Sequence, residues 1–447
     1  MAQPRRRKPV LEPIYDWSQL ADRAWPNLLL GNGFSRAISD DFEYGSLFKT
    51  ACESGYLSPH AASLFVDDEG EEVRNFEWVL RRLAIAASVS ETIGTVPRYV
   101  SRLRSLYEEI RSALINTVND SHVARSDIPR ERLLCLGIEL MQHERVFTTN
   151  YDLIPYWALN ALRDCIVARW PPPFVDGFFR SGHSPEPIDF DEDAAEDLIE
   201  RTPDSMRLFY LHGALHLATD EHPSGMKLVG GQTSILNLWS KPKASWIPLA
   251  VTEGTSRAKM LSIESVHYLR WANRALAGVP GNVVVFGHGL DQEADAHIAK
   301  ALSAGTEGTA RTVAVSLYGS DDAEDRNLLD VQAHYRGMLA GVEEILFFKA
   351  ETHPLSSLSE LHTRWLVRSD LTPAAFARTA RTVLAPSSGF PVFRQHGSQI
   401  DSKPAGFWPV SDDFPHVLLG STGVLSCEIG IGDRWHPVSP VRLAANL

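Results

Sequence analysis

The 447-residue sequence predicts an α/β fold. We expect a Rossmann-like, mostly parallel sheet of about six strands with helical insertions, followed by a small Pro/Gly-rich C-terminal segment. Two observations predict this fold: short apolar runs of strand length recur along the chain, and stretches with apolar residues at helical spacing separate them. Such apolar strands suit a sheet covered on both faces, which is typical of parallel sheets. Ligands should then bind at the carboxyl ends of the strands.

Six apolar runs are the candidate strands. They span residues 27–30, 145–147, 208–211, 283–286, 313–318 and 345–348. Four of them lead directly into small or polar residues, with the sequences GNGFS from residue 31, TTNYD from residue 148, HG from residue 212 and GHG from residue 287. Because these segments all follow strands, they are the candidates for a binding site.

Three insertions separate the strands. The first is helical, since Phe76, Val79, Leu80 and Leu83 recur at helical spacing, and it predicts an inserted layer beside the sheet. The second covers about residues 153–207 and has nine carboxylates between residues 186 and 204, which predict a solvated loop or an exposed helix. No metal is expected there, because no ligand spacing accompanies the charges. The third covers about residues 217–281.

The tail differs in composition, with seven Pro and seven Gly among its last 62 residues. This composition predicts short strands with turns, or partial disorder. We expect an N-terminal arm over residues 1–26, a main domain over residues 27–355 and a C-terminal appendage over residues 356–447.

Composition excludes several classes of protein. With 43 basic and 56 acidic residues the net charge is −13, which argues against non-specific nucleic-acid binding. We find no apolar stretch of transmembrane length and no secretion signal, so we expect a cytoplasmic protein that does not bind membranes. The four cysteines form no CxxC pair, so we expect buried thiols and neither a zinc site nor a disulfide framework.

The first glycine motif is ambiguous by itself. Gly31 and Gly33 would allow a tight turn and close approach to a pyrophosphate, with Ser35 as the cap of the next helix. However, Arg36 stands where the dinucleotide fingerprint has its third glycine. A turn without a ligand therefore remains an equal alternative.

The order of the four motifs resembles the sirtuin-like fold over about residues 27–350. Sirtuins carry a GAG-type loop followed by Ser, a TQN-Asp loop, a His-Gly motif and a GTS-type loop, in that order. The sequence is similar to a divergent, uncharacterised bacterial branch with GNGFS, TTNYD, YLHGALH and GHGL segments, and also NFE at residues 75–77 and VTEGTS at residues 251–256. The resemblance implies an NAD site. Because several sirtuin-like bacterial proteins hydrolyse NAD during antiphage defence, it also implies NAD hydrolysis in such a role.

The resemblance also implies roles for single residues. Asn150 and His212 match the catalytic Asn and His, and Glu77 is a second-tier candidate. His288 departs from the usual Thr, and Asn32 from the usual Ala. From the residues alone, His216, His288 and His297 are expected to be structural or peripheral, with His288 the one that could face the pocket. The residues implied to bind NAD are Gly31, Asn32, Gly33, Phe34, Ser35, Thr149, Asp152, Gly287, His288 and Gly289.

These residue types suit cleavage of the nicotinamide N-glycosidic bond, which develops positive charge on the ribose carbon. A neutral imidazole at His212 can accept a proton from a ribose hydroxyl or a water. The Asn150 amide offers a donor and an acceptor to that water. The sequence therefore favours an NAD hydrolase, with a homo-oligomer or a regulatory partner protein left open.

Three alternatives remain. One is a module that binds or senses NAD or ADP-ribose without hydrolysis. Another is an interaction scaffold with a decayed site, which would bind neither NAD nor ADP-ribose. The third is an NAD-dependent protein deacylase, which is disfavoured because the paired-cysteine zinc module of deacylating sirtuins is missing. Hydride transfer is weaker still, because the glycine fingerprint is incomplete.

Overall fold

The structure is a computed structural model. It describes residues 11–38, 47–66, 70, 72, 74, 76–121, 123–165, 172–179, 187–220, 223–228, 246–251, 255–304, 311–321 and 325–356, and four strands of the C-terminal segment. No helix within these ranges combines the length and apolar character needed to cross a membrane.

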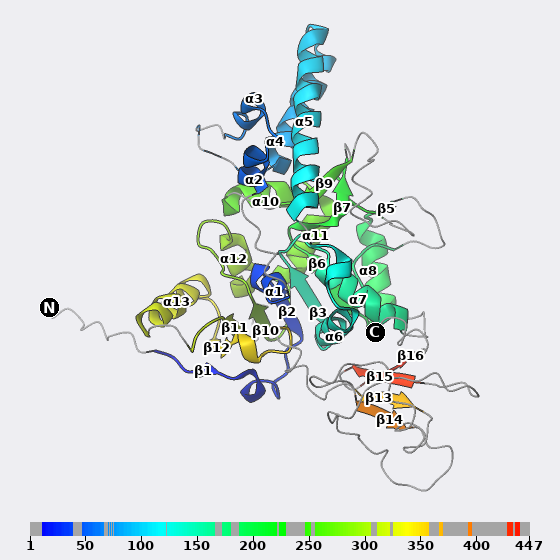
Figure 1. Ribbon diagram of the computed structural model, residues 1–447, viewed down its shortest axis with the longest axis vertical. Coiled ribbons are helices and arrows are strands. Elements are labelled where there is room, and N and C mark those ends of the chain that lie inside the picture. Colours follow the sequence, from blue (N-terminus) through cyan, green and yellow to red (C-terminus); the bar gives the residue numbers. More distant parts are fainter. Residues whose placement is uncertain are drawn as a thin grey trace, which may run out of the picture.

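A parallel sheet of eight strands forms the centre of the molecule (Figure 1). Its order is β1-β12-β11-β10-β2-β3-β6-β4. The strands are β1 (Ile14–Tyr15), β2 (Asn27–Leu30), β3 (Arg145–Thr148), β4 (Phe174–Val175), β6 (Met206–Tyr210), β10 (Val283–Phe286), β11 (Thr312–Leu317) and β12 (Glu344–Lys349). All six candidate strands lie in it, so the predicted fold class is confirmed. The sequence patterns did not reveal β1 and β4, which are only two residues long.

The chain crosses the middle of this sheet at a single point. After β1, which pairs with β12 at one edge, the chain enters the centre at β2 and adds β3, β4 and β6 on one side; it then returns to add β10, β11 and β12 on the other. Such a reversal opens a crevice at the carboxyl ends of the two central strands, here β2 and β10. The loops that follow these strands begin at Gly31 and Gly287.

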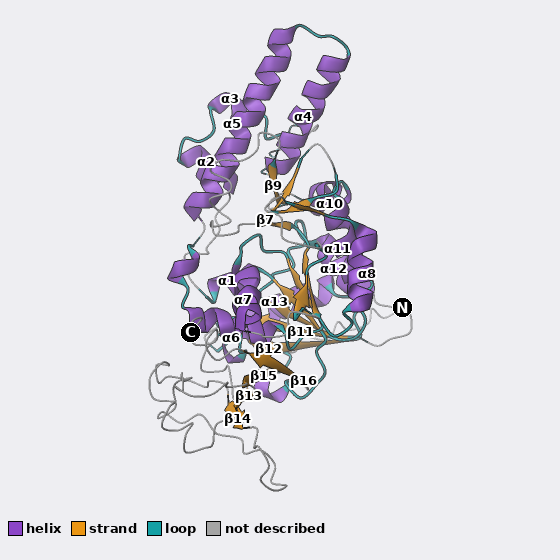
Figure 2. Ribbon diagram, turned by 90° about the vertical axis from the view of Figure 1, so that its right-hand side faces the viewer, coloured by secondary structure: helices purple, strands orange, loops and turns teal. Residues whose placement is uncertain are grey.

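The central strands are buried on both faces, as their apolar sequences require. Leu28, Leu29, Val284 and Val285 are fully buried and lie in register between β2 and β10. Burying each such side chain contributes about 1.5–3 kcal/mol. Helices α6 (Arg130–Leu140) and α7 (Ile154–Cys165) lie on one side of the sheet, and α11 (His267–Ala277) and α12 (Ala296–Ala304) on the other (Figure 2).

The first insertion is helical, as predicted, but only its last helix, α6, lies beside the main sheet. Its long helices α4 (Phe76–Thr92) and α5 (Pro97–Ser121) form an antiparallel hairpin that projects from one end of the molecule (Figures 1 and 2). Helix α4 contacts β9 (Ile247–Ala250) and α10 (Ser256–Glu264). The other described helices are α1 (Asn32–Arg36), α2 (Leu47–Glu53), α3 (Pro59–Ala62), α8 (Glu192–Arg201) and α13 (Asp325–Met338).

The second and third insertions are not purely helical. They supply an antiparallel sheet, in the order β5 (Ile188–Asp189), β8 (Met226–Lys227), β7 (Gly213–Thr219) and β9. Within the described part of the acidic stretch, α8 buries only Ala195 and Leu198 and turns its carboxylates outward. The prediction of an exposed helix is therefore confirmed there.

Two further sequence predictions concern the tail and the thiols. Four strands of the C-terminal segment form a sheet in the order β14 (Val392–Gln395), β13 (Leu366–Ser369), β15 (Cys427–Ile431) and β16 (Arg434–Val438). The predicted short strands are thus present, whereas the rest of the tail lies outside the described residues. The prediction of buried thiols is wrong for Cys52, which is exposed because α2 turns it outward.

Candidate active site

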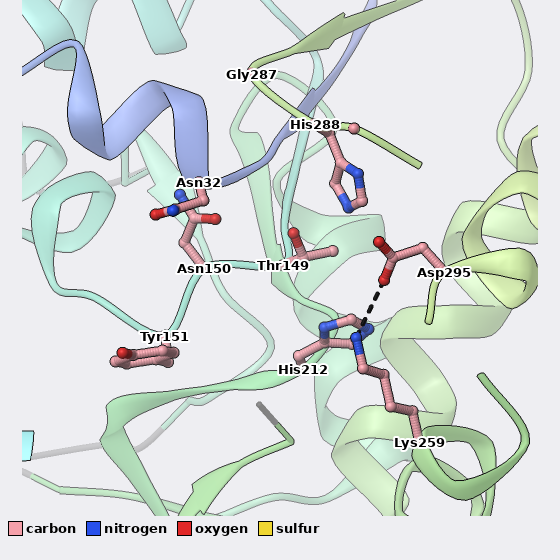
Figure 3. Close-up of a pocket in the computed structure, with 10 residues that line it drawn as sticks. Asn32, Thr149, Asn150, Tyr151, His212, Lys259, Gly287, His288 and Asp295 are labelled. Atoms are coloured by element: carbon pink, nitrogen blue, oxygen red, sulfur yellow. Dashed lines mark hydrogen bonds and ion pairs between the residues drawn. The ribbon is translucent and has the colours of Figure 1, made fainter. Parts of the chain in front are cut away.

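A cavity of about 260 Å³ lies at the crevice between β2 and β10 (Figure 3). Its walls come from segments that are far apart in the sequence, including the loops after β2, β3, β6 and β10. The lining residues are Asn32, Thr149, Asn150, Tyr151, His212, Lys259, Gly287, His288, Gly289 and Asp295.

Seven of the predicted site residues line this cavity, namely Asn32, Thr149, Asn150, His212, Gly287, His288 and Gly289. Five others do not line it: Gly31, Gly33, Phe34, Ser35 and Asp152. Phe34, Ser35 and Asp152 are fully buried. The predicted residue Glu77 belongs to α4, but its side chain lies outside the described part of the chain.

The glycines of the first motif have a packing role. The Gly31 N–H donates to the Phe286 carbonyl at 2.9 Å, and the Gly33 N–H donates to the Gly287 carbonyl at 2.7 Å. A Cβ on Gly31 would lie 2.5 Å from the Cα of His288, and one on Gly33 would lie 2.7 Å from the Cα of Gly287. Two loops can therefore approach this closely only because both positions lack side chains. Direct contact of these two N–H groups with a phosphate, as the resemblance implies, would require both bonds to open.

The Asn150 carboxamide has a fixed orientation. Its Nδ2 donates to the Gly31 carbonyl at 2.9 Å and to Ser35 Oγ at 2.8 Å. Ser35 Oγ in turn donates to Asp152 Oδ2 at 2.5 Å. Because a carbonyl only accepts, the amide nitrogen must face Gly31, and Oδ1 must point the other way. The remaining polar atom of this cavity-lining side chain is thus an acceptor.

Asp152 holds Asn150 in place indirectly, through Ser35. Its Oδ1 accepts the Ile154 N–H at 2.9 Å at the start of α7, and its Oδ2 accepts the Ser35 hydroxyl. Complete burial raises the pKa of Asp152 to about 6, although both hydrogen bonds act in the opposite direction. Asp152 therefore acts through Ser35 and does not contact the cavity directly.

His212 enters the cavity from the turn between β6 and β7. The following residue, Gly213, has a φ of 79°, and a Cβ there would lie 2.0 Å from the Leu249 carbonyl oxygen, so the backbone requires glycine directly after His212. His212 Nε2 lies 2.9 Å from His297 Nε2. Burial lowers the pKa of His212 well below its usual value, and nearby Lys259 adds to this effect. His212 is therefore neutral at pH 7.

His297, which the sequence suggested to be structural or peripheral, does not line the cavity but contacts His212 directly. Its Nδ1 lies 2.9 Å from Ser256 Oγ, and its backbone N–H donates to the same oxygen at 2.9 Å. Burial, with help from Lys259, lowers the pKa of His297 to about 4. His216, by contrast, lies apart from the cavity lining, packed against the rings of Tyr156 and Tyr210.

An ion pair closes the wall opposite Asn150. Lys259 Nζ donates to Asp295 Oδ1 at 3.1 Å, and both side chains are largely buried (Figure 3). Burial alone would raise the pKa of Asp295, but His288 and Lys259 outweigh it and lower that pKa. His288 also lines this wall, and its Nδ1 accepts the Leu290 N–H at 3.0 Å.

Sequence reasoning missed three residues of the lining: Tyr151, Lys259 and Asp295. Tyr151 lies within the TTNYD motif and could have been included on that ground. Lys259 stands on α10 and Asp295 just before α12, so neither one directly follows a strand end. Among the described residues, no group of three or more His, Cys, Asp or Glu side chains could hold a metal ion.

Comparison with protein families assigns this chain to a family without revealing its activity. Residues 28–355 match the model described as Domain of unknown function (DUF4917). The chain belongs to this family. The matched range contains both halves of the cavity, from Asn32 to Asp295. No curated protein matches the chain.

Proposed function

We propose that this member of the DUF4917 family hydrolyses NAD⁺ to nicotinamide and ADP-ribose in the cavity between β2 and β10. Four motifs with the order of the sirtuin loops support the proposal, because they end around one cavity although they are spread over more than half of the chain. That cavity lies where the strand order reverses, which is where sheets of this type bind nucleotides.

The orientation of Asn150 carries the proposal. Both hydrogens of its amide are used within the protein, so its Oδ1 can accept a hydrogen from a water in the cavity. A water held in this way keeps an oxygen lone pair for attack on the ribose carbon. The amide donor that we expected from the sequence is not available, so the role of Asn150 narrows to that of an acceptor.

The neutral state of His212 fits the same reaction. As the glycosidic bond breaks, its electron pair leaves with nicotinamide and positive charge develops on the ribose. An imidazolium nearby would oppose that charge, whereas a neutral imidazole does not. Burial and Lys259 keep His212 neutral, and it can accept the proton that the attacking water gives up.

The size of the cavity limits which part of the substrate it encloses. About 260 Å³ lies below the roughly 300–1,000 Å³ that is typical for sites of drug-sized ligands. We therefore place the nicotinamide ribose in the cavity and the adenosine half outside its enclosed part. Since the N–H groups of Gly31 and Gly33 bond to the neighbouring loop, the Asn32 side chain is the better candidate for a diphosphate contact.

The proposal is tested by incubating the purified full chain with NAD⁺ and quantifying nicotinamide and ADP-ribose by chromatography. We expect both products from the parent, and a rate at least about 100-fold lower from Asn150→Ala and from His212→Ala. His267→Gln, at an exposed histidine outside the cavity, is the matched control and should keep the parent rate. The proposal fails if the parent, with or without candidate triggers, releases no nicotinamide, or if both alanine variants match it.

The same assay separates the alternatives. Binding of NAD⁺ or ADP-ribose without turnover, unaffected by His212→Ala, would indicate a binding or sensor module. Nicotinamide release that requires an acylated peptide would indicate a deacylase. A role in antiphage defence is part of the proposal and predicts that NAD⁺ falls in phage-infected cells with the parent chain but not with His212→Ala.

A further inference from the structure

Three side chains connect the buried end of the cavity to the surface. His212 is 4% exposed, whereas His297 and Ser256 are both partly exposed. The contacts between His212 Nε2 and His297 Nε2 and between His297 Nδ1 and Ser256 Oγ are both 2.9 Å. Three different segments supply the groups: the turn after β6, the first turn of α12 and the first residue of α10.

This chain of hydrogen bonds can run in two directions. If His212 Nε2–H donates to His297, then neutral His297 carries its proton on Nδ1 and donates it to Ser256, and His212 Nδ1 is a bare acceptor. If Ser256 donates to His297 instead, then His297 Nε2–H donates to His212, and His212 Nδ1 carries the proton. The direction of the chain therefore decides whether Nδ1 of His212 is a base or a donor.

We propose that His297, held by Ser256, is the positioning residue that sets the tautomer of His212 and that the three groups form a proton path out of the cavity. The proton path rests on the proposed hydrolysis of NAD⁺, whereas the effect of His297 on the His212 tautomer does not. A proton from the attacking water binds His212 Nδ1, and the Nε2 proton passes to His297 Nε2. The Nδ1 proton of His297 then passes to Ser256 Oγ, whose own proton leaves to solvent. One proton leaves for each one that enters, and nothing is oxidised.

The electrostatic surroundings explain why a relay is needed. Lys259 on α10 and His288 on the loop after β10 both disfavour a charged imidazole at His212 and at His297. Asp295 favours the charged form of His297 but is paired with Lys259. If the protons shift together along these hydrogen bonds, every imidazole is neutral at the end. No imidazolium then persists beside the Lys259 ammonium.

Kinetics test the proton path. We expect His297→Gln and Ser256→Ala to lower kcat for nicotinamide release about 10- to 100-fold with KM nearly unchanged, and to change the solvent deuterium isotope effect on kcat. His267→Gln and Ser265→Ala are the matched controls, because neither residue takes part in the hydrogen bonds that link His212, His297 and Ser256. If the parent hydrolyses NAD⁺ and neither kcat nor the isotope effect changes in the variants, the path is overturned.

A measurement without substrate tests the tautomer separately. In ¹⁵N-histidine-labelled protein, the ring nitrogen resonances distinguish a protonated from a bare nitrogen, and the spectra of His212→Ala and His297→Gln assign the two residues. We expect Ser256→Ala to change the tautomer populations of both His212 and His297, and Ser265→Ala to change neither. Unchanged populations in Ser256→Ala overturn the inference whatever the activity. Changed populations in a parent that does not hydrolyse NAD⁺ support the tautomer control and count against the proposed function.

Discussion

The two walls of the cavity are built from different chemistry. On the β3 side, Asn150, Ser35 and Asp152 form a closed network with the Gly31 carbonyl, in which nearly every donor and acceptor is used inside the protein. On the opposite side the wall consists of titratable groups, which are His212, His288, Lys259 and Asp295, and His297 contacts His212 from outside the lining.

The difference separates two tasks. The closed network has few alternative arrangements, so it can hold one acceptor atom at a fixed position. The titratable wall has hydrogen bonds that can reverse direction, so it can accept and pass on a proton. We infer that the first wall sets geometry and that the second sets the response to pH. Three measurements test whether the two walls differ in this way, and the largest expected effect comes first.

The largest effect is expected where the two walls touch. Gly287 has a φ of 67°, and a Cβ there would lie 2.4 Å from the Phe34 backbone nitrogen. Gly287→Ala should therefore lower the free energy of unfolding by about 3 kcal/mol or more and abolish nicotinamide release. Urea denaturation measures the first effect. Gly289→Ala is the control, because that Cβ would meet open space and should cost less than about 0.5 kcal/mol. Equal stability of the two variants would contradict the tight contact.

Acid should weaken the titratable wall. The pKa of His297 is about 4 in the folded chain, below the unfolded value near 6.5, so the unfolded chain binds protons more readily. Its contribution to stability is present above pH 6.5 and is lost as the pH falls towards 4. We expect the free energy of unfolding to drop by about 2 kcal/mol between pH 7 and pH 5 through this residue. His297→Gln should remove that part of the drop, and His267→Gln should not. An identical pH dependence in all three proteins would refute the burial of a neutral His297.

Asp152 should respond to acid in the opposite direction. Its pKa is about 6 in the folded chain, above the unfolded value near 3.9, so its contribution is present below the unfolded pKa and is lost as the pH rises through 6. Asp152→Asn carries no such charge. We expect the stability of the variant relative to the parent to rise by about 2 kcal/mol between pH 4 and pH 7.

The net effect of Asp152→Asn at pH 7 should be small, about 1 kcal/mol, because the amide cannot accept both the Ser35 hydroxyl and the Ile154 N–H. Urea denaturation at both pH values measures the difference. A parent and a variant with parallel pH profiles would mean that Asp152 is ionised in both states at pH 5.

The sequence predicted one wall of the cavity better than the other. Thr149 and Asn150 were found because a polar motif follows a strand, and the carboxyl ends of parallel strands meet at one edge. We predicted that the Asn150 amide offers both a donor and an acceptor, but only the acceptor is available. No local pattern shows that Gly31 and Ser35 use both amide hydrogens. Likewise, the glycines looked like a phosphate loop, whereas their N–H groups bond to the loop after β10.

The titratable wall was largely hidden from sequence reasoning. Lys259 lies on α10 and Asp295 just before α12, at positions where charged residues are usually solvated, and His297 was expected to be structural or peripheral. Only the packing of α10 and α12 beside the turn after β6 turns these side chains inward. Burial then shifts their pKa values, and burial is a property of the folded chain alone.

By itself, the sequence determined the α/β class, the six central strands and the order of the motifs at their ends, because apolar runs and glycines act over a few residues. The tertiary structure decided which motif atoms remain available in the cavity and that the hairpin of α4 and α5 projects outward. It also joined Ser256, His297 and His212 into one chain of hydrogen bonds. These outcomes depend on contacts between residues up to 119 positions apart in sequence, which no local pattern encodes.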